Sequence, residues 1–143
     1  MRITTKGRYA VRAIVQLAMQ GNEKPVSIRK ISEIENISAE FLEQIFFKLR
    51  KGGIISSVRG PGGGFKLIRE AENITIAEIF DAVGEGLLLS PCVEDSPKSC
   101  ERFSECVVNQ LWNNSYLHFR GYFEKTTLQD VIKGNFKKSL DMR

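Results

Sequence analysis

The 143-residue sequence predicts a mainly α fold with one small β-hairpin. Apolar residues recur at helical spacing in six segments, and polar or glycine-containing turns separate these segments. Between the third and fourth segments, the glycine-rich stretch "GPGGG" is flanked by two short apolar runs, which is typical of a hairpin tip. With 42% hydrophobic and 27% charged residues, the chain has the composition of a globular protein that can build one or two small cores.

The first three predicted helices form one compact group. Apolar spacing predicts a helix from Tyr9 to Met19, and Gly21 follows where a left-handed residue commonly ends a helix. Ser27 is predicted to cap a short second helix whose isoleucines lie three residues apart. Ser38 is predicted to cap a third helix, which has cationic side chains in its last turn and ends at the Gly-Gly pair 52–53. Two helices joined by a short turn are typical of a helix-turn-helix.

A hairpin is predicted directly after the third helix. The stretch "IISSVRGPGGGFKLI" indicates two short strands around a tip that Pro61 stiffens by fixing its own φ angle. Positive φ angles are expected at the four tip glycines, which are Gly60, Gly62, Gly63 and Gly64. The order of three helices and a hairpin is that of a winged helix.

The second half of the chain is predicted to be helical around a cysteine-containing loop. Thr75 and Glu78 have the spacing of a capping box, as do Thr127 and Asp130 before a last short helix. Between them, the segment "CVVNQLWNNSYLHFRGYFEK" shows an aromatic stripe at helical spacing over about 17 residues. A stripe this wide requires a partner surface, so we interpret Trp112 as a core or interface residue.

The charge is distributed unevenly along the chain. Residues 1–70 contain 13 Lys and Arg against 6 Asp and Glu, whereas residues 71–143 contain 8 against 11, within a total net charge of +4. A basic first half joined to an acidic second half indicates that one part faces a polyanion, and nucleic acid is the expected partner.

The third helix and the hairpin contain the candidate DNA-binding residues. In a winged helix the N-terminal residues of the third helix face base edges, where Gln44 can pair with adenine and Glu43 can accept from a cytosine amino group. Arg59 and the glycine-rich tip suit the minor groove, whose negative potential attracts arginine. The alternative interpretations are a solvated helix face and a plain surface hairpin.

Three cysteines, Cys92, Cys100 and Cys106, lie in the segment "SPCVEDSPKSCERFSEC", and the chain has no others. Their separations do not match the short spacing of structural zinc sites, and no nearby histidine completes a zinc ligand set. The many charged neighbours indicate an exposed loop rather than buried, inert thiols. Soft thiolates from such a loop suit an iron-sulfur cluster.

Other classes of function have no support in the sequence. The chain contains no Ser/His/Asp set, paired-carboxylate site, P-loop or dinucleotide fingerprint, so no enzyme activity is expected. The N-terminal segment lacks the apolar core of a signal peptide, and no apolar run approaches the length of a membrane span. We therefore expect a cytoplasmic protein without a membrane partner, in a compartment that keeps thiols reduced.

Several motifs together resemble the IscR/NsrR/CymR family of winged-helix transcription regulators, nearest to its iron-sulfur cluster regulator branch. They are "MRITTKGRYAVRAI", "ISAEFLEQIFFKLRKGGIISSVRGPGGGF", the three-cysteine loop, "LW" after the third cysteine, and "TLQDVI", and they extend to about residue 134. The resemblance implies a homodimer joined through the long C-terminal helix, a cluster held by the three cysteines, and binding to palindromic double-stranded promoter DNA. The resemblance also implies base-reading roles for Ser38, Glu43 and Gln44 and a minor-groove role for Arg59, Gly60 and Pro61.

The sequence departs from this family at the fourth cluster ligand. The iron-sulfur regulators have a histidine three residues after the third cysteine, where this chain has Asn109. Nitric-oxide sensing relatives use an acidic residue near the start of the first helix, where this chain has Arg8. The lone histidine, His118, lies within the aromatic stripe and is interpreted as a packed or surface residue. Of the two common cluster types, 2Fe-2S is expected before 4Fe-4S.

The predicted architecture is mainly α with a small β-hairpin wing, a winged helix-turn-helix plus a long C-terminal dimerisation helix. We assign residues 1–72 to DNA binding and residues 73–143 to the cluster-binding loop and dimerisation helices. The functional hypothesis is a dimeric regulator whose promoter affinity depends on the cluster and which senses iron-sulfur status or oxidative or nitrosative stress. The alternatives are a cluster-free regulator controlled by cysteine oxidation or a partner protein, and an iron-sulfur electron carrier with a basic accessory domain.

Overall fold

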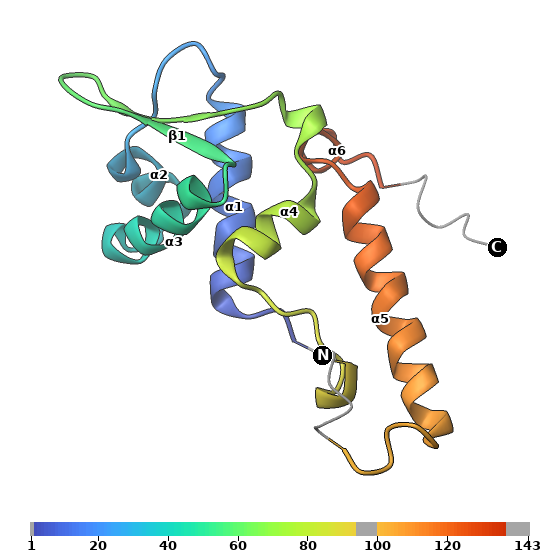
Figure 1. The fold of residues 1–143 in the computed structure, drawn as a ribbon. Helices are drawn as coiled ribbons and strands as arrows, with labels where there is room; N and C mark the ends of the chain where they lie inside the picture. The colour runs from blue at the N-terminus through green and yellow to red at the C-terminus, as the bar shows by residue number, and fades with distance from the viewer. Residues whose placement is uncertain (1, 94–99, 137–143) are drawn as a thin grey trace.

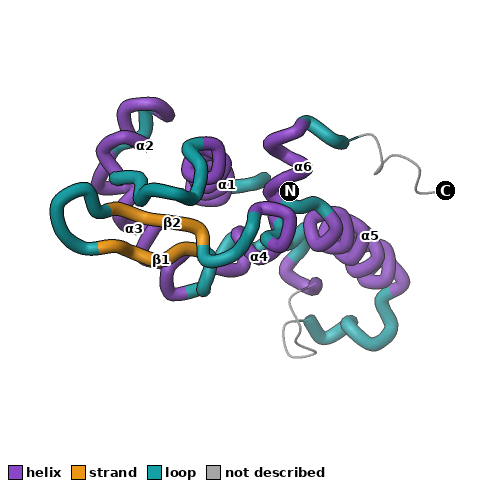
Figure 2. The backbone as a smooth tube through the Cα atoms, turned by 90° about the horizontal axis from the view of Figure 1, so that it is seen from above, coloured by secondary structure: helices purple, strands orange, loops and turns teal. Residues whose placement is uncertain are grey.

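A computed structural model describes residues 2–93 and 100–136 and confirms the predicted winged-helix order (Figure 1). Three helices, α1 (Thr5–Met19), α2 (Ile28–Glu35) and α3 (Ala39–Lys51), precede the antiparallel strands β1 (Ile55–Val58) and β2 (Gly64–Leu67). The chain continues through the 3-10 turn η1 (Ala71–Asn73), helix α4 (Ile76–Val83), the turn η2 (Pro91–Val93), the long helix α5 (Val107–Lys125) and helix α6 (Leu128–Lys133). Figure 2 shows the hairpin, α2 and α3 at one end of the molecule and α5 at the other.

The helix boundaries follow local capping chemistry. The side chains of Ser27 and Ser38 accept hydrogen bonds from the backbone N–H groups of Lys30 and Phe41, both at 3.2 Å, as the sequence predicts. The prediction for the first helix was wrong at its start, because α1 begins at Thr5 with Thr4 as its N-cap. Its first turn is polar and therefore gives no apolar signal.

One buried apolar core joins the winged-helix elements to the segments that follow. It includes Phe46 of α3, whose ring lies 4.9 Å from that of Phe65 in β2 and so holds the wing against the helices. The same core includes Ile74 and Leu128 from beyond the predicted domain boundary at residue 72. The N–H of Leu128 donates to the carbonyl of Ile74 at 2.8 Å, so the start of α6 is hydrogen-bonded to the segment that precedes α4.

The wing is a two-stranded hairpin anchored at its base and exposed at its tip. Phe65 exchanges two backbone hydrogen bonds, at 2.8 and 2.9 Å, with Val26 in front of α2. At the tip, Gly60 has a φ of 101°, which supports the expectation of a left-handed conformation there. Gly63 does not have a positive φ, so that expectation was wrong, but an added Cβ at Gly63 would lie 2.3 Å from the carbonyl oxygen of Val58. Glycine is needed at this position for space rather than for its φ angle.

Helix α5 leans against α4 and continues away from the other helices (Figure 1). The rings of Phe80 and Phe123 meet edge to face at 5.1 Å, and Arg120 binds both carboxylate oxygens of Asp81 at 2.6 and 2.7 Å. The guanidinium hydrogen bonds lower the pKa of the Asp81 carboxyl below its usual value. An aromatic contact and a bidentate ion pair therefore both hold α5 against α4.

The linker after α4 is hydrogen-bonded to the start of α1 through Glu85. Glu85 is buried, and its carboxylate accepts hydrogen bonds from the backbone N–H of Thr4 at 3.0 Å and from the Thr4 hydroxyl. An added Cβ at Gly7 would lie 2.6 Å from a Glu85 carboxylate oxygen. This contact requires glycine at position 7, in the first turn of α1.

Replacing Gly7 by alanine should therefore lower the free energy of unfolding by about 1–3 kcal/mol, because the buried carboxylate must leave its Thr4 partners. Gly121 in α5 is the matched control, since an added Cβ there meets no heavy atom within 4 Å. Gly121→Ala should raise stability by up to about 1 kcal/mol through helix propensity. Urea unfolding measures the free energy of unfolding of both variants. Equal changes in the two variants would contradict the close approach of Glu85 to α1.

Candidate DNA-binding surface and cysteine site

The outward face of α3 contains the predicted base-reading residues. Leu42, Ile45, Phe46 and Leu49 are buried, whereas Ser38, Glu43 and Gln44 are exposed. The Ser38 hydroxyl oxygen already accepts the capping hydrogen bond from Phe41, so its O–H remains available as a donor. The structure therefore leaves all three side chains accessible to a partner, with Ser38 at the N-cap and Glu43 and Gln44 in the first half of the helix.

Cationic side chains continue this surface toward the wing. Lys48, Arg50 and Lys51 are exposed in the last turns of α3, and an Arg50 guanidinium nitrogen lies 3.5 Å from the Ser57 hydroxyl of β1. Arg59, Gly60 and Pro61 are all exposed at the tip of the hairpin. The two views of the backbone place this tip at the same end of the molecule as α2 and α3 (Figures 1 and 2).

Two of the three cysteines lie on segments that pack together. Cys92 lies in η2 and Cys106 is the N-cap of α5, and both are half-buried, whereas Cys100 is exposed. Asn109 connects the first two, since its side-chain amide donates to the Cys92 carbonyl at 2.9 Å and its backbone N–H donates to the Cys106 carbonyl at 3.1 Å. None of the three thiols is in a disulfide.

The Cys92 thiol has a polar partner close to its sulfur. The Ser90 hydroxyl lies 2.7 Å from its sulfur, and this hydrogen bond, with a smaller contribution from Asn109, lowers the pKa of the Cys92 thiol against the opposing effect of burial. A thiol with a lowered pKa has more thiolate, which is the form that binds metals and reacts with oxidants.

The described residues do not contain a preassembled metal site. Within residues 2–93 and 100–136, no three His, Cys, Asp or Glu side chains converge closely enough to hold an ion. The donor chemistry nevertheless fits iron-sulfur ligation, because three unpaired thiols are present and Asn109 holds the segments of two of them together. Cys100 would have to approach the other two for all three to bind one cluster.

The alternative ligands considered from the sequence lie elsewhere. His118 is exposed on α5, and twelve residues of helix separate it from Cys106 by about 18 Å. Arg8 is exposed on α1 and its guanidinium donates to the Thr5 hydroxyl at 3.3 Å. Asn109, at the position of the family histidine, contacts the Cys92 segment through its side-chain amide.

Helix α5 presents an extended apolar surface. Within the described part of the chain none of its residues is fully buried, and Trp112 is 39% exposed. Its other exposed apolar side chains are Val107, Val108, Leu111, Leu117 and Phe119. Large exposed apolar surfaces of this kind commonly mark protein interaction sites.

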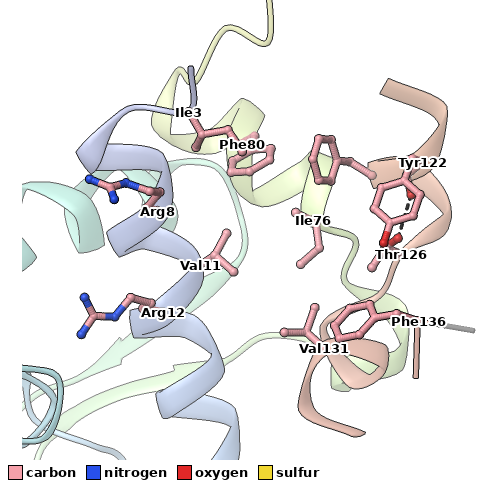
Figure 3. A pocket seen from close by; sticks show the side chains of 11 residues that line it. Ile3, Arg8, Val11, Arg12, Ile76, Phe80, Tyr122, Thr126, Val131 and Phe136 are labelled. Atoms are coloured by element: carbon pink, nitrogen blue, oxygen red, sulfur yellow. Dashed lines mark hydrogen bonds between the residues drawn. The ribbon is translucent and has the colours of Figure 1, made fainter. Parts of the chain in front are cut away.

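An apolar pocket of about 360 Å³ opens near the C-terminal end of α5 (Figure 3). Val11 of α1 and Ile76 and Phe80 of the α4 segment face the Tyr122 ring across it, while the guanidinium groups of Arg8 and Arg12 point away from the aromatic side chains. Arg12 instead pairs with Glu35 at 2.9 Å. The pocket is therefore a second apolar surface, close to the one along α5.

The helix-turn-helix with its outward third helix, the glycine-tipped wing and the long apolar C-terminal helix together define a winged-helix DNA-binding transcription regulator. The chain belongs to the Rrf2 family of iron-dependent transcriptional regulators, because that family's sequence pattern matches residues 3–134. It is a regulator and not an enzyme, as predicted. Within the described residues, no helix is long and apolar enough to cross a membrane.

Individual relatives support the same assignment. The chain is 38% identical over 142 residues to the HTH-type transcriptional regulator IscR of Photorhabdus laumondii, covering 99% of this chain and 84% of the relative. It is 39% identical over 139 residues to an HTH-type regulator of Haemophilus influenzae, covering 96% and 91% of the two chains.

Solved structures resemble the whole fold. The structure of T. potens IscR matches with a TM-score of 0.75 at 31% identity, covering 100% of this chain and 93% of that one. The structure of CymR, the global cysteine regulator of B. subtilis, matches with a TM-score of 0.75 at 29% identity, covering 93% and 97%. The resemblance inferred from the sequence motifs is thus confirmed.

Proposed function

We propose that this protein is a cytoplasmic, homodimeric regulator whose affinity for palindromic promoter DNA depends on an iron-sulfur cluster held by Cys92, Cys100 and Cys106. The observation that carries the proposal is the Asn109 bridge, which holds the segments of two cysteines together at the start of the proposed dimerisation helix. Membership of a family of iron-dependent regulators supports the choice of cofactor. A bound cluster would report iron-sulfur supply or oxidative or nitrosative stress, because oxidants and nitric oxide react with its iron and sulfide.

Asn109 acts in this proposal as a positioning residue. A neutral amide is a poor ligand for iron, and the side-chain NH₂ group of Asn109 already donates to the Cys92 carbonyl. Three cysteines then leave the fourth ligand position open to an acidic side chain, the partner subunit or a small thiol. Such a weak fourth bond suits a sensor that must lose or remodel its cluster.

The chain offers a continuous route from the cysteines to the DNA-binding surface. Seven residues before Cys92, Glu85 is hydrogen-bonded to Thr4 at the start of α1. Helix α1 packs on both α2 and α3 within the same core. A shift of the Cys92 segment would therefore act on the N-terminus of α1, which in turn supports the base-reading helix.

Dimerisation would bury the apolar surface of α5 and explain the palindromic target. A two-fold symmetric dimer presents two copies of α3 and of the wing, so each copy contacts one half-site. In each copy the cationic end of α3 and Arg59 would contact the DNA backbone and minor groove, while Gln44 and Glu43 would read bases.

Glu43 is expected to restrict the range of sites, because a carboxylate near the anionic duplex is unfavourable unless a base offers it a donor. Glu43→Ala should therefore bind a broader set of sequences, with a loss of discrimination of about 1–3 kcal/mol at the base pair concerned. A selection from randomised duplexes with both proteins measures the change. Gln44→Ala is the matched control on the same face of α3, and it should weaken the base preference at a different position of the site. If Glu43→Ala selects the same sequences as the wild type, Glu43 does not read a base.

An absorption spectrum of anaerobically purified protein tests the cofactor directly, because a cluster gives visible charge-transfer bands and bare thiols give none. A cluster-free regulator controlled by cysteine oxidation is the second candidate. It is favoured by the lowered pKa of Cys92 and by the similarity to S. aureus CymR, which has also been solved in an oxidised form, at 32% identity and a TM-score of 0.70. Salt-dependent binding of the protein to its own promoter would exclude the electron-carrier alternative.

A further inference from the structure

Phe47 is an aromatic side chain that α3 turns away from the core. Its side chain is 58% exposed, while the preceding Phe46 is completely buried against the wing. In the helix Phe47 lies one turn after Glu43 and Gln44. These residues, with Glu40 and Lys48, line a shallow groove on the outward face of α3. The sequence pattern "IFFK" therefore places one phenylalanine inside and one among the predicted base readers.

The contacts of Phe47 hold its ring on this surface. The Arg50 guanidinium lies 5.9 Å from the centre of the ring, a cation–π geometry, and Arg50 also reaches Ser57 of the wing. Phe47 thus lies between the predicted base readers on one side and the cationic end of α3 and the wing on the other. Because the Phe47 ring lies outside the core, core packing does not explain an aromatic residue at this position.

We propose that Phe47 is a specificity-determining residue that contacts the 5-methyl group of a thymine in the major groove. This inference rests on the proposed base-reading role of α3. The thymine methyl is an apolar group on the major-groove edge, and a phenylalanine ring is among the side chains that recognise it. The cations Lys48 and Arg50 beside the ring complement the phosphates that flank such a methyl group.

Duplex DNA is favoured over a protein partner by the position of the ring. Three cations lie on the C-terminal side of the ring, in the last turn of α3, and suit a polyanion, while Glu40 and Glu43 line the groove on its N-terminal side. The extended apolar surface that a second copy would cover lies on α5, at the opposite end of the molecule from α3 (Figure 2). The thymine contacted should lie next to the base pair that Gln44 reads, since the two side chains are one helical turn apart.

The experiment removes only the methyl group. A duplex selected by the wild-type full-length chain is resynthesised with deoxyuridine in place of each thymine in turn, and dissociation constants are measured at fixed salt concentration. At one position per half-site, deoxyuridine should weaken wild-type binding about fourfold, the factor expected for one buried methyl group. Phe47→Ala should bind the selected duplex more weakly and show no further loss from deoxyuridine at that position.

Three controls make the result specific. Gln44→Ala should remain sensitive to the methyl deletion, Phe47→Leu should keep part of that sensitivity, and Met19→Ala, which alters another exposed apolar residue, should bind like the wild type. Equal methyl sensitivity in Phe47→Ala and the wild type, or no sensitive thymine in the wild type, would overturn the role of Phe47 alone. A wild-type chain without any sequence preference would overturn the base-reading function of α3 as well.

Discussion

Replacing any one of Cys92, Cys100 and Cys106 by alanine should abolish cluster assembly during anaerobic reconstitution. Only three thiols are available, and all three are free, so the loss of one leaves too few ligands to retain an iron-sulfur cluster. The visible absorption bands and the iron content per chain measure the loss. The variants should remain folded, because none of these cysteines belongs to the buried core.

Two further variants locate the fourth ligand. His118→Ala should retain the cluster, since His118 is exposed on α5 and lies about 18 Å along the helix from Cys106. Asn109→His should slow cluster loss in air, because it introduces an imidazole one helical turn after Cys106, next to the Cys92 segment. A cluster that persists without one of the cysteines, or that disappears in His118→Ala, would overturn this ligand set.

Replacing Arg59 by alanine should weaken promoter binding at least about tenfold, which is more than the loss of one surface charge explains. Arg59 is exposed at the start of the stiff glycine-rich tip, where a guanidinium can enter a narrow minor groove and respond to its shape as well as to its charge. Binding isotherms at several salt concentrations separate the two contributions, because the charge contribution changes the salt dependence.

Arg59→Lys is the matched control for charge. It keeps the cation but replaces the weakly hydrated, planar guanidinium, so its affinity should fall between those of the wild type and Arg59→Ala. If Arg59→Ala binds promoter DNA as tightly as the wild type, the wing has no minor-groove role.

Features determined by neighbouring residues were predictable from the sequence. The capping residues Ser27, Ser38, Thr75 and Thr127 were all identified correctly, because each cap is a local hydrogen bond within three residues. The hairpin was identified because a tight tip has few alternatives to glycine. Where the local signal was absent, as in the polar first turn of α1, the prediction of a start at Tyr9 was wrong.

Contacts between distant segments were not predictable in this way. Glu85 meets Thr4 across 81 residues, and Arg120 meets Asp81 across 39. Nothing in either local sequence specifies the partner, because such pairs depend on how whole helices pack. The hydrogen bond from Asn109 to Cys92 is an intermediate case. The family resemblance drew attention to residue 109, and the structure showed that its side chain donates to the Cys92 carbonyl.

Phe47 shows a different limit of sequence reading. Two adjacent phenylalanines in an apolar helix are both compatible with a core, and only the helix orientation separates the buried Phe46 from the exposed Phe47. The three cysteines were grouped from the sequence alone, whereas the contact through Asn109 that joins the segments of Cys92 and Cys106 depends on how α5 packs and appears only in the structure.

Control of DNA binding by the cluster is tested most directly by one affinity measurement. A single anaerobic preparation is divided, the cluster is removed from one half, and both halves are titrated with the protein's own promoter duplex at the same salt concentration. We expect dissociation constants that differ by about tenfold, within the usual range of coupling between two sites, and no difference after the same treatment of a chain lacking all three cysteines. Equal dissociation constants for the two halves of the wild-type preparation would contradict control by the cluster.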